Sequence, residues 1–318
     1  MLVVGDVVTD IVARHGAPLA PGTDTAAAIR AVPGGAGANV ACWAASWGCR
    51  DVRFLGRVGA DSVRWHEEAL TRAGVRPRLV VDHEAPTGTV ICLVDGGAGA
   101  GAERTFLTDS GASLRLSAAD WSPALLDGVG WLHLSGYLFF AEPSRAVAET
   151  ALGAARARGV PVSVDPASAG FLAELGVERF LAAVDGVDVL LPSEGEARAL
   201  AGAPGVEDAG GVLLAEAAAK LSRRFPVVVV KRGAAGALLA RDGEVRAEIP
   251  AQPATARDST GAGDAFTGAF LAARLGGGGL REASAEGCRA GARAVELVGG
   301  RPLPAQGWGR DDHGLSRG

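Results

Sequence analysis

Short apolar runs recur along the chain, and each one ends in a glycine, a polar or a charged residue before a helix-like stretch. The runs occupy residues 2–4, 129–134, 160–164, 187–191 and 227–230. Near-continuous apolar strands are typical of a parallel sheet that helices cover on both faces. Amphipathic or alanine-rich stretches alternate with these runs, at 143–158, 194–200 and 213–224. The alternation predicts an α/β fold with a doubly wound, mostly parallel sheet flanked by helices.

Polar side chains gather where these strands are expected to end. In sheets of this kind, ligands bind beyond the carboxyl ends of the strands. The pattern therefore predicts a site built from residues at these ends, namely Asp6, Asp10, Ser135, Asp165, Ser193, Glu196 and Lys231.

Two stretches interrupt the alternation. Residues 11–33 combine Pro, Gly and Thr with short β-like pieces, and residues 87–108 read as a hairpin around a Gly/Ala-rich turn at 96–102. Together they predict a small β lid over the main sheet. We expect one domain over 1–303 that includes this lid, followed by a loosely held polar tail at 304–318.

Composition narrows the classes of function. The 318 residues carry a net charge of -5, so a basic surface for nucleic acid is not expected. The chain contains neither a P-loop motif nor the glycine fingerprint of dinucleotide-binding enzymes. The N-terminus does not read as a signal peptide, and no apolar run is long enough to span a membrane. We therefore expect a cytoplasmic protein that binds neither nucleic acid nor a membrane.

Cysteine and histidine do not indicate disulfides or zinc. The four cysteines form no Cys-x-x-Cys pair, and the five histidines lack metal-ligand spacing. We expect reduced, buried thiols.

The most informative segment is 257–270, Arg-Asp-Ser-Thr-Gly-Ala-Gly-Asp-Ala-Phe-Thr-Gly-Ala-Phe. Gly261, Ala262 and Gly263 form a loop almost without side chains, and a helix is expected to begin at Asp264. A helix start exposes unpaired N–H groups and a positive dipole end, and glycine lets an anion approach the backbone closely. A cradle for an anion beside a carboxylate suits phosphoryl transfer to a hydroxyl. The alternative is that Asp264 only caps the helix.

The string Asp-Ser-Thr-Gly-Ala-Gly-Asp-Ala-Phe resembles the C-terminal signature of the ribokinase-like carbohydrate kinases, the PfkB family. Residues 34–41, Gly-Gly-Ala-Gly-Ala-Asn-Val-Ala, resemble the N-terminal signature of that family. The resemblance runs from residue 2 to about residue 300. It implies a kinase that transfers the γ-phosphoryl group of ATP to a sugar or sugar-acid hydroxyl with the help of Mg²⁺.

The resemblance places the catalytic centre in the glycine loop. Asp264 would act as general base, and we expect the helix start to keep its carboxylate ionised. The N–H groups of Gly261, Ala262 and Gly263 would bind the transferring phosphoryl group as an anion hole.

The nucleotide side follows from two further segments. Lys231, Gly233 and Gly236 lie in a strand-turn segment that resembles the family's phosphate- and ribose-binding stretch; the alternative is an ordinary turn with a solvated lysine. Ser193 replaces the family's usual Asn three residues before Glu196, which would orient waters on Mg²⁺. Ser193 and Glu196 also fit a helix capping box.

On the acceptor side, the resemblance implies that carboxylate, amide and backbone groups bind the sugar hydroxyls. Asp6 has the alternative of a structural role at the strand end, and Arg104 on the lid has the alternative of a surface charge. Gly136 stands where ribokinases usually carry Glu, which argues against ribose. The expected set is Asp6, Asp10, Gly34, Gly35, Asn39 and Arg104.

The family resemblance also implies a monovalent cation, usually K⁺. Asp258 and Thr260 would contribute, together with backbone carbonyls of Ala294, Leu297 and Gly299. The alternative is that Asp258 only stabilises its turn.

Other assignments stay open at the level of sequence. A homodimer formed through the lid is implied by the resemblance. A nucleoside kinase of the same family is the main rival, although the lid offers few aromatic residues for a base. A sensor that binds sugar or nucleotide without catalysis is a third reading, which the intact Asp264 and its glycine loop disfavour.

Overall fold

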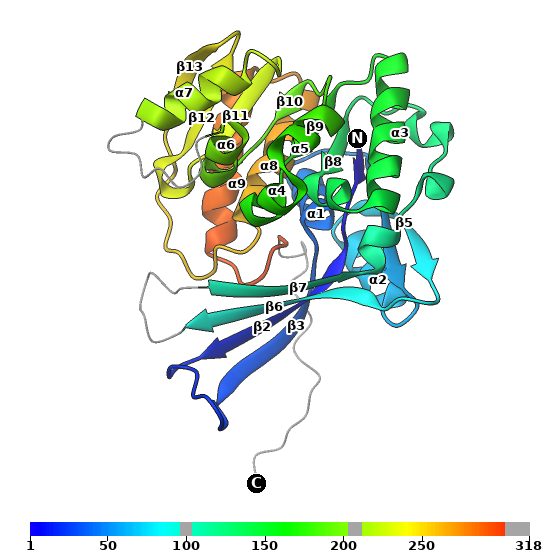
Figure 1. Cartoon of the computed structure of the whole chain (residues 1–318), viewed down its shortest axis with the longest axis vertical. Helices are drawn as coiled ribbons and strands as arrows, with labels where there is room; N and C mark the ends of the chain where they lie inside the picture. Colours follow the sequence, from blue (N-terminus) through cyan, green and yellow to red (C-terminus); the bar gives the residue numbers. More distant parts are fainter. Residues whose placement is uncertain (96–103, 203–211, 303–318) are drawn as a thin grey trace.

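The computed structural model describes residues 1–95, 104–202 and 212–302, and its centre is a nine-stranded sheet (Figure 1). Seven neighbouring strands, from β11 to β5 in the spatial order, are parallel, and β12 and β13 add an antiparallel edge. In spatial order the strands are β13 (Glu244–Ile249), β12 (Ala237–Arg241), β11 (Val227–Lys231), β10 (Val189–Leu190), β9 (Val162–Asp165), β8 (Leu132–Ser135), β1 (Leu2–Val4), β4 (Val52–Gly59) and β5 (Val75–Asp82).

Helices cover both faces of this sheet, which confirms the predicted fold class. One face packs against α3 (Glu142–Ala157), α4 (Ala169–Leu175), α5 (Val177–Ala183), α6 (Glu194–Leu200) and α7 (Val212–Leu221). The other packs against α1 (Ala36–Ser46), α2 (Val63–Arg72), α8 (Ala262–Leu275) and α9 (Leu280–Val295). Because side chains alternate along a strand, Val228 faces the first layer and Val229 the second, and both are fully buried.

The apolar runs of the sequence match β1, β8, β9, β10 and β11. Strands β4 and β5 were not expected, because arginine, glycine and proline interrupt their apolar positions. Strand β5 lies at the edge of the sheet. There Pro77, which has no N–H group, does not break a hydrogen bond between two interior strands. Edge position thus explains why a polar-looking segment forms a strand.

The predicted lid is a separate four-stranded sheet across the carboxyl ends of the main strands (Figure 1). Its order is β3 (Ala27–Gly34), β2 (Val8–His15), β6 (Thr87–Asp95) and β7 (Arg104–Gly111). The lid therefore begins at residue 8 rather than 11 and extends to 34 and 111 rather than 33 and 108. The turn at 96–102 and the tail at 304–318 lie outside the described residues.

The strand order reverses at β1, and this reversal positions the site. From β1 the chain builds β4 and β5 on one side, and later β8 to β11 on the other. Such a switch point opens a crevice at the carboxyl ends of the two flanking strands. Here Asp6 follows β1 and Ser135 ends β8, and the Ser135 hydroxyl donates a 2.7 Å hydrogen bond to Asp6 Oδ1.

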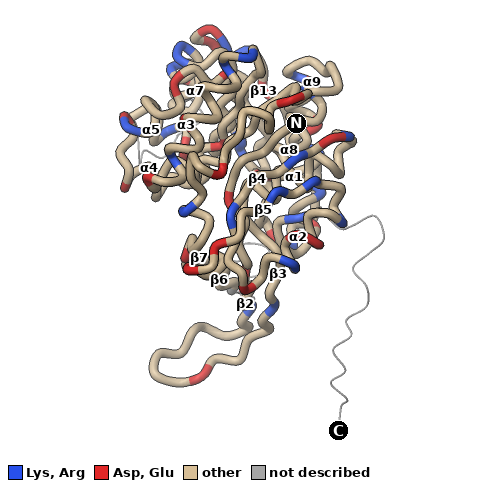
Figure 2. Tube along the Cα trace, turned by 90° about the vertical axis from the view of Figure 1, so that its right-hand side faces the viewer, with Lys and Arg blue, Asp and Glu red and all other residues tan. Residues whose placement is uncertain are grey.

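Acidic and basic residues are interspersed along the trace in Figure 2. Within the part of the chain that the structure describes, no helix has the length and apolar character needed to cross a bilayer.

Candidate active site

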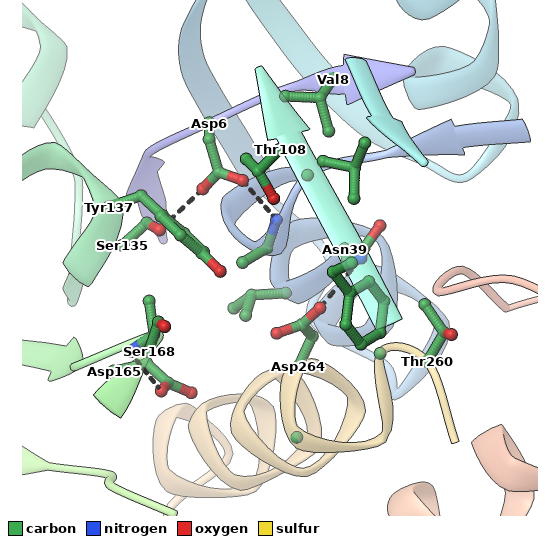
Figure 3. Close-up of a pocket in the computed structure, with 18 of the residues that line it drawn as sticks. Asp6, Val8, Asn39, Thr108, Ser135, Tyr137, Asp165, Ser168, Thr260 and Asp264 are labelled. Carbon is green, nitrogen blue, oxygen red and sulfur yellow. Dashed lines mark hydrogen bonds between the residues drawn. The ribbon is translucent and has the colours of Figure 1, made fainter. Parts of the chain in front are cut away.

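A cavity of about 1180 Å³ lies between the carboxyl ends of the main strands and the lid. It brings together most of the residues that the sequence singled out, from both halves of the chain (Figure 3). Of the predicted site residues, those lining it are Asp6, Asp10, Gly35, Asn39, Ser193, Glu196, Lys231, Gly233, Thr260, Gly261, Ala262, Gly263 and Asp264.

The glycine loop opens helix α8 as its N-terminal turn. Gly261 is the N-cap in the left-handed conformation (φ +72°), and a Cβ there would lie 2.5 Å from Gly300 Cα. Glycine is therefore required by both backbone and packing. The helix begins at Ala262, two residues earlier than expected, which puts Asp264 in its first turn with Gly263. Gly261, Ala262 and Gly263 all line the cavity, and the Ala262 N–H group already donates to Ser259 O at 3.3 Å. The N–H groups that follow it in the first turn are the ones left for an anion.

Asp264 points into the cavity and is held by one side-chain hydrogen bond. Asn39 Nδ2 donates to Asp264 Oδ2 at 2.9 Å, and Figure 3 shows the two side chains directed at each other. Burial raises the pKa of Asp264 to about 7; the Asn39 hydrogen bond opposes this, and the nearby Asp165 adds to it. Burial thus works against the expectation that the helix start keeps Asp264 ionised.

Asp6 is occupied by the structure around it. Its carboxylate accepts hydrogen bonds from the backbone N–H groups of Ala36 (2.6 Å) and Gly37 (3.1 Å), as well as from Ser135. It thereby fixes the start of α1, where Gly35 has φ +99° and a Cβ would lie 2.6 Å from Asp6 O. The alternative reading of Asp6 as a strand-end structural residue explains these contacts better than a sugar ligand does.

Asp10 is the carboxylate of the lid that faces the cavity. Burial raises its pKa to about 7, the cation of Arg301 opposes this shift, and Asp6 adds to it. A Cβ on Gly34 would lie 2.2 Å from Asp10 Oδ2, so glycine at this position leaves room for the carboxylate. Gly34 thus acts through Asp10 and is not itself part of the cavity lining.

Lys231, at the end of β11, is paired with Asp165, at the end of β9. Thr267 of α8 donates to the same Asp165 oxygen at 3.0 Å. Burial would lower the pKa of Lys231, but the carboxylates of Asp165 and Glu196 outweigh it, and the pKa is raised. The side chain is only 12% exposed in this ion pair, which argues against the solvated-charge alternative.

Ser193 and Glu196 form the capping box of α6. Ser193 N–H donates to Glu196 Oε2 at 2.8 Å, and Glu196 N–H donates to Ser193 Oγ at 3.4 Å. Burial, then the neighbouring Asp165, raises the pKa of Glu196. The buried carboxylates of Asp165 and Glu196 at one wall fit Mg²⁺, because this ion keeps much of its water shell and needs few direct protein ligands. Among the described residues, no group of three or more His, Cys, Asp or Glu side chains is arranged to hold a metal directly.

The two glycines after β11 differ. Gly233 lines the cavity and has open space where a Cβ would be. Gly236 does not line it: its φ is +85°, and a Cβ would lie 2.0 Å from Ile249 O. The turn into β12 therefore requires Gly236. Because Gly236 does not line the cavity, its predicted contact with the nucleotide is corrected.

The two segments expected to bind a monovalent cation do meet. Asp258 Oδ1 accepts from Thr260 N–H at 2.9 Å, and Oδ2 accepts from Gly299 N–H at 2.8 Å. The Val295 carbonyl accepts from the N–H groups of Arg257 and Asp258. Asp258 thus links the segments, as its turn-stabilising alternative proposed, while the buried Thr260 Oγ1 has no hydrogen-bond partner among the described residues.

Sequence reasoning missed several residues at this site. The aromatic side chains of Phe106, Tyr137 and Phe171 line the cavity, and only Phe106 belongs to the lid, so most of the aromatic surface comes from the main body. Tyr137 lies two residues after the end of β8, a position that could have revealed it. Arg104 begins β7, and its side chain lies outside the described residues. Buried Arg301, which contacts Asn39, carried no motif signal.

Comparisons with known proteins agree with this geometry. The model of the pfkB family carbohydrate kinase matches residues 1–306. A fructokinase from Klebsiella pneumoniae is 32% identical over 85% of this chain and 82% of its own length.

Two solved structures share the fold. An adenosine kinase from Sinorhizobium meliloti has a TM-score of 0.82 at 22% identity, covering 95% of both chains. A candidate ribokinase II from E. coli, solved with ATP and Mg²⁺, has a TM-score of 0.76 at 24% identity, covering 94% of this chain and 93% of its own. From its family match and its fructokinase relative, this chain belongs to the pfkB family and is a carbohydrate kinase.

Proposed function

We propose that this kinase transfers the γ-phosphoryl group of ATP to a hydroxyl of a small sugar or sugar acid, with Asp264 as general base. The observation that carries the proposal is the placement of Asp264 beside the start of α8, in one cavity with Asp10 and Lys231. A proton acceptor, an anion cradle and a polar acceptor wall are the three parts that this reaction needs.

The chemical step uses these groups in order. The acceptor hydroxyl gives its proton to Asp264 while its oxygen forms a bond to the γ-phosphorus, and the bond from that phosphorus to the β-phosphate bridging oxygen breaks. ADP leaves with the electron pair of the broken bond. The N–H group of Gly263 would neutralise charge on the transferring oxygens, and that of Ala262 could join it only by giving up its bond to Ser259 O. Asp10 would bind hydroxyls that do not react and so set the pose of the acceptor.

The nucleotide would enter from the β11 side. Lys231 lies at that wall and supplies a cation for the phosphates, and Gly233 leaves the backbone open to them. Glu196 would orient waters of a Mg²⁺ ion, which would neutralise phosphate charge when bound. A K⁺ ion held by carbonyls of Ala294, Leu297 and Gly299 with Thr260 stays a prediction, as do a dimer formed through the lid, a contact from Arg104 and a cytoplasmic location.

A nucleoside acceptor is the second candidate. It is favoured by the aromatic side chains of Phe106, Tyr137 and Phe171 along the cavity, because a base stacks on aromatic faces. The fold is shared with an adenosine kinase. The carboxylate of Asp10 favours a polyol, which has more hydroxyls to donate.

A panel of acceptors separates these candidates. ATP turnover is measured by coupled ADP release with fructose, ribose, a 2-keto-3-deoxy acid and adenosine, each at matched concentration with Mg²⁺. We expect turnover with fructose or the sugar acid and little with ribose. Turnover with adenosine alone would favour the nucleoside kinase. Tight binding of a sugar without turnover of any acceptor would favour the sensor.

The pH dependence tests the base directly. Because the pKa of Asp264 is raised to about 7, its carboxylate is protonated below that pH and cannot accept a proton. We expect kcat/KM for the acceptor to rise between about pH 6 and pH 8 and then level off. The measurement is kcat/KM across pH 5.5 to 9 at about 0.15 M ionic strength.

The control is Asp10→Asn, because burial also raises the pKa of Asp10 to about 7. This variant should bind the acceptor less well but keep the acidic limb of the profile. If the limb disappears with Asp10→Asn, the titrating group is Asp10 and the assignment to Asp264 is wrong.

A further inference from the structure

A buried arginine lies behind the proposed base. Arg301 follows α9, and only 7% of its surface is exposed. None of the ion pairs found among the described residues includes its guanidinium, and Cys42, Asp10 and Asp6 offset the effect of burial only in part. Burial accordingly lowers the pKa of Arg301. A buried charge without an ion-pair partner lowers the stability of a fold. We therefore examine the contacts of the Arg301 guanidinium for a functional role.

Arg301 contacts two oxygen atoms, one at the end of β3 and one in the first turns of α1. Its Nη2 donates to Gly34 O at 2.8 Å, and its Nε donates to Asn39 Oδ1 at 3.3 Å. Its Nη1 has no hydrogen-bond partner among the described residues. The segment is held in place by Trp43, whose indole N–H donates to Gly300 O at 2.9 Å. Arg301 thus reaches the same side chain that contacts Asp264.

These contacts determine how the Asn39 amide is turned. An asparagine side chain has one oxygen that accepts and one NH₂ that donates, and a guanidinium nitrogen can only donate. Arg301 Nε therefore requires Asn39 Oδ1 on its side, and the NH₂ group must face Asp264 Oδ2, where it lies at 2.9 Å. A flipped amide would set its oxygen against the carboxylate and its NH₂ against the guanidinium, and both contacts would be repulsive.

The chain also leaves space for this arrangement. A Cβ on Gly300 would lie 2.4 Å from Asn39 Nδ2, so a side chain at residue 300 would displace the amide. Gly300 and Arg301 together form a seat for Asn39, built from a segment more than 250 positions away in sequence.

We propose that Arg301 is a positioning residue: it locks the Asn39 amide in the orientation that hydrogen-bonds and aims the Asp264 carboxylate. The proposal rests on the proposed role of Asp264 as base. Arg301 itself does not line the cavity, so it does not touch the substrate, and its hydrogen bond into the site goes to Asn39.

The kinetic test is Arg301→Met, which keeps an unbranched apolar stem but removes the guanidinium and its donors. We expect kcat to fall at least about tenfold while KM for ATP stays within about twofold, because the nucleotide wall is untouched. Arg293→Met is the control, since it removes an exposed guanidinium from α9 and should leave kcat unchanged. An unchanged kcat in Arg301→Met would overturn the proposal.

A double-mutant cycle separates positioning from general stability. If Arg301 acts through Asn39, then adding Arg301→Met to Asn39→Ala should cost almost nothing further in kcat. Losses that multiply across the two variants would show that Arg301 acts by another route and would overturn the proposal. Should Arg301→Met fail to fold, Arg301→Lys replaces it: one ammonium cannot hold both Gly34 O and Asn39 Oδ1, so a loss in kcat is still expected, and wild-type kcat would count against the proposal.

A spectroscopic readout is independent of turnover, because Asn39 is the single asparagine in the sequence. Protein labelled with ¹⁵N-asparagine gives one side-chain NH₂ pair. We expect two well-separated proton shifts in the wild type, since one proton binds a carboxylate, and convergence or exchange broadening in Arg301→Met. Arg293→Met should match the wild type. A wild-type NH₂ pair in folded Arg301→Met would overturn the proposal.

The two readouts keep this proposal distinct from the proposed function. If Asp264→Asn retains activity, the assignment of the base fails. The NH₂ pair would still report whether Arg301 holds the Asn39 amide.

Discussion

Replacement of Asp264 by Asn is expected to lower kcat about 10³-fold, the largest effect of any single change at the site. The amide keeps the size of the side chain but cannot accept the proton of the acceptor hydroxyl. It would also face the NH₂ group of Asn39, which now donates at 2.9 Å to a carboxylate. ATP affinity should be nearly unchanged, because Lys231 and the start of α8 are intact. Steady-state kcat and equilibrium titration with ATP, in the absence of acceptor, measure the two quantities.

The control for this substitution is Asp242→Asn. Asp242 is exposed in the turn between β12 and β13, and its φ of +55° is one that Asn tolerates well. Wild-type kcat is expected there. If Asp264→Asn keeps a tenth or more of the wild-type kcat, another group removes the proton.

Gly263→Val should have the second-largest effect, a loss of about 10²-fold in kcat. A Cβ at residue 263 would lie 3.4 Å from Lys231 Nζ, so a branched side chain would occupy the space between the helix start and the lysine. The phosphoryl group could then not approach the N–H groups of the first turn. Unlike Asp264→Asn, this variant should also weaken ATP binding, and titration with ATP would show it.

An exposed glycine in α3 provides the comparison. At Gly153 an added Cβ meets nothing within 4 Å, so Gly153→Val tests the effect of a Gly-to-Val change in a helix without a clash. It should leave kcat and ATP binding unchanged. If the two valine variants behave alike, the start of α8 is not the anion hole.

The sequence was sufficient for the features that depend on local pattern. Apolar runs predicted the parallel strands from β8 to β11, and the glycine string predicted the loop before α8. Local chemistry also identified the capping box of Ser193 and Glu196, which the structure contains. These features succeed because a strand, a cap or a glycine turn is determined by residues within a few positions of each other.

The remaining features depend on contacts between distant segments. The raised pKa of Asp264 arises from burial and from the nearby Asp165. The pattern of residues at a helix start gives information about neither. Asp6 was predicted to bind the sugar, with a structural role as the alternative. The sequence could not decide between them, because the bonds of Asp6 to Ala36 and Gly37 span about thirty positions. Arg301 had no motif, since its partner lies near the other end of the chain.

The origin of Asp10 has a consequence for which alcohols can react. Asp10 belongs to a lid strand, β2, whereas Asn39 and Asp264 belong to helices of the main body. A polyol long enough to touch both carboxylates would link the lid sheet to the main body. An alcohol that reaches only one of them would lose that link as well as a hydrogen bond, so we expect it to be the poorer acceptor.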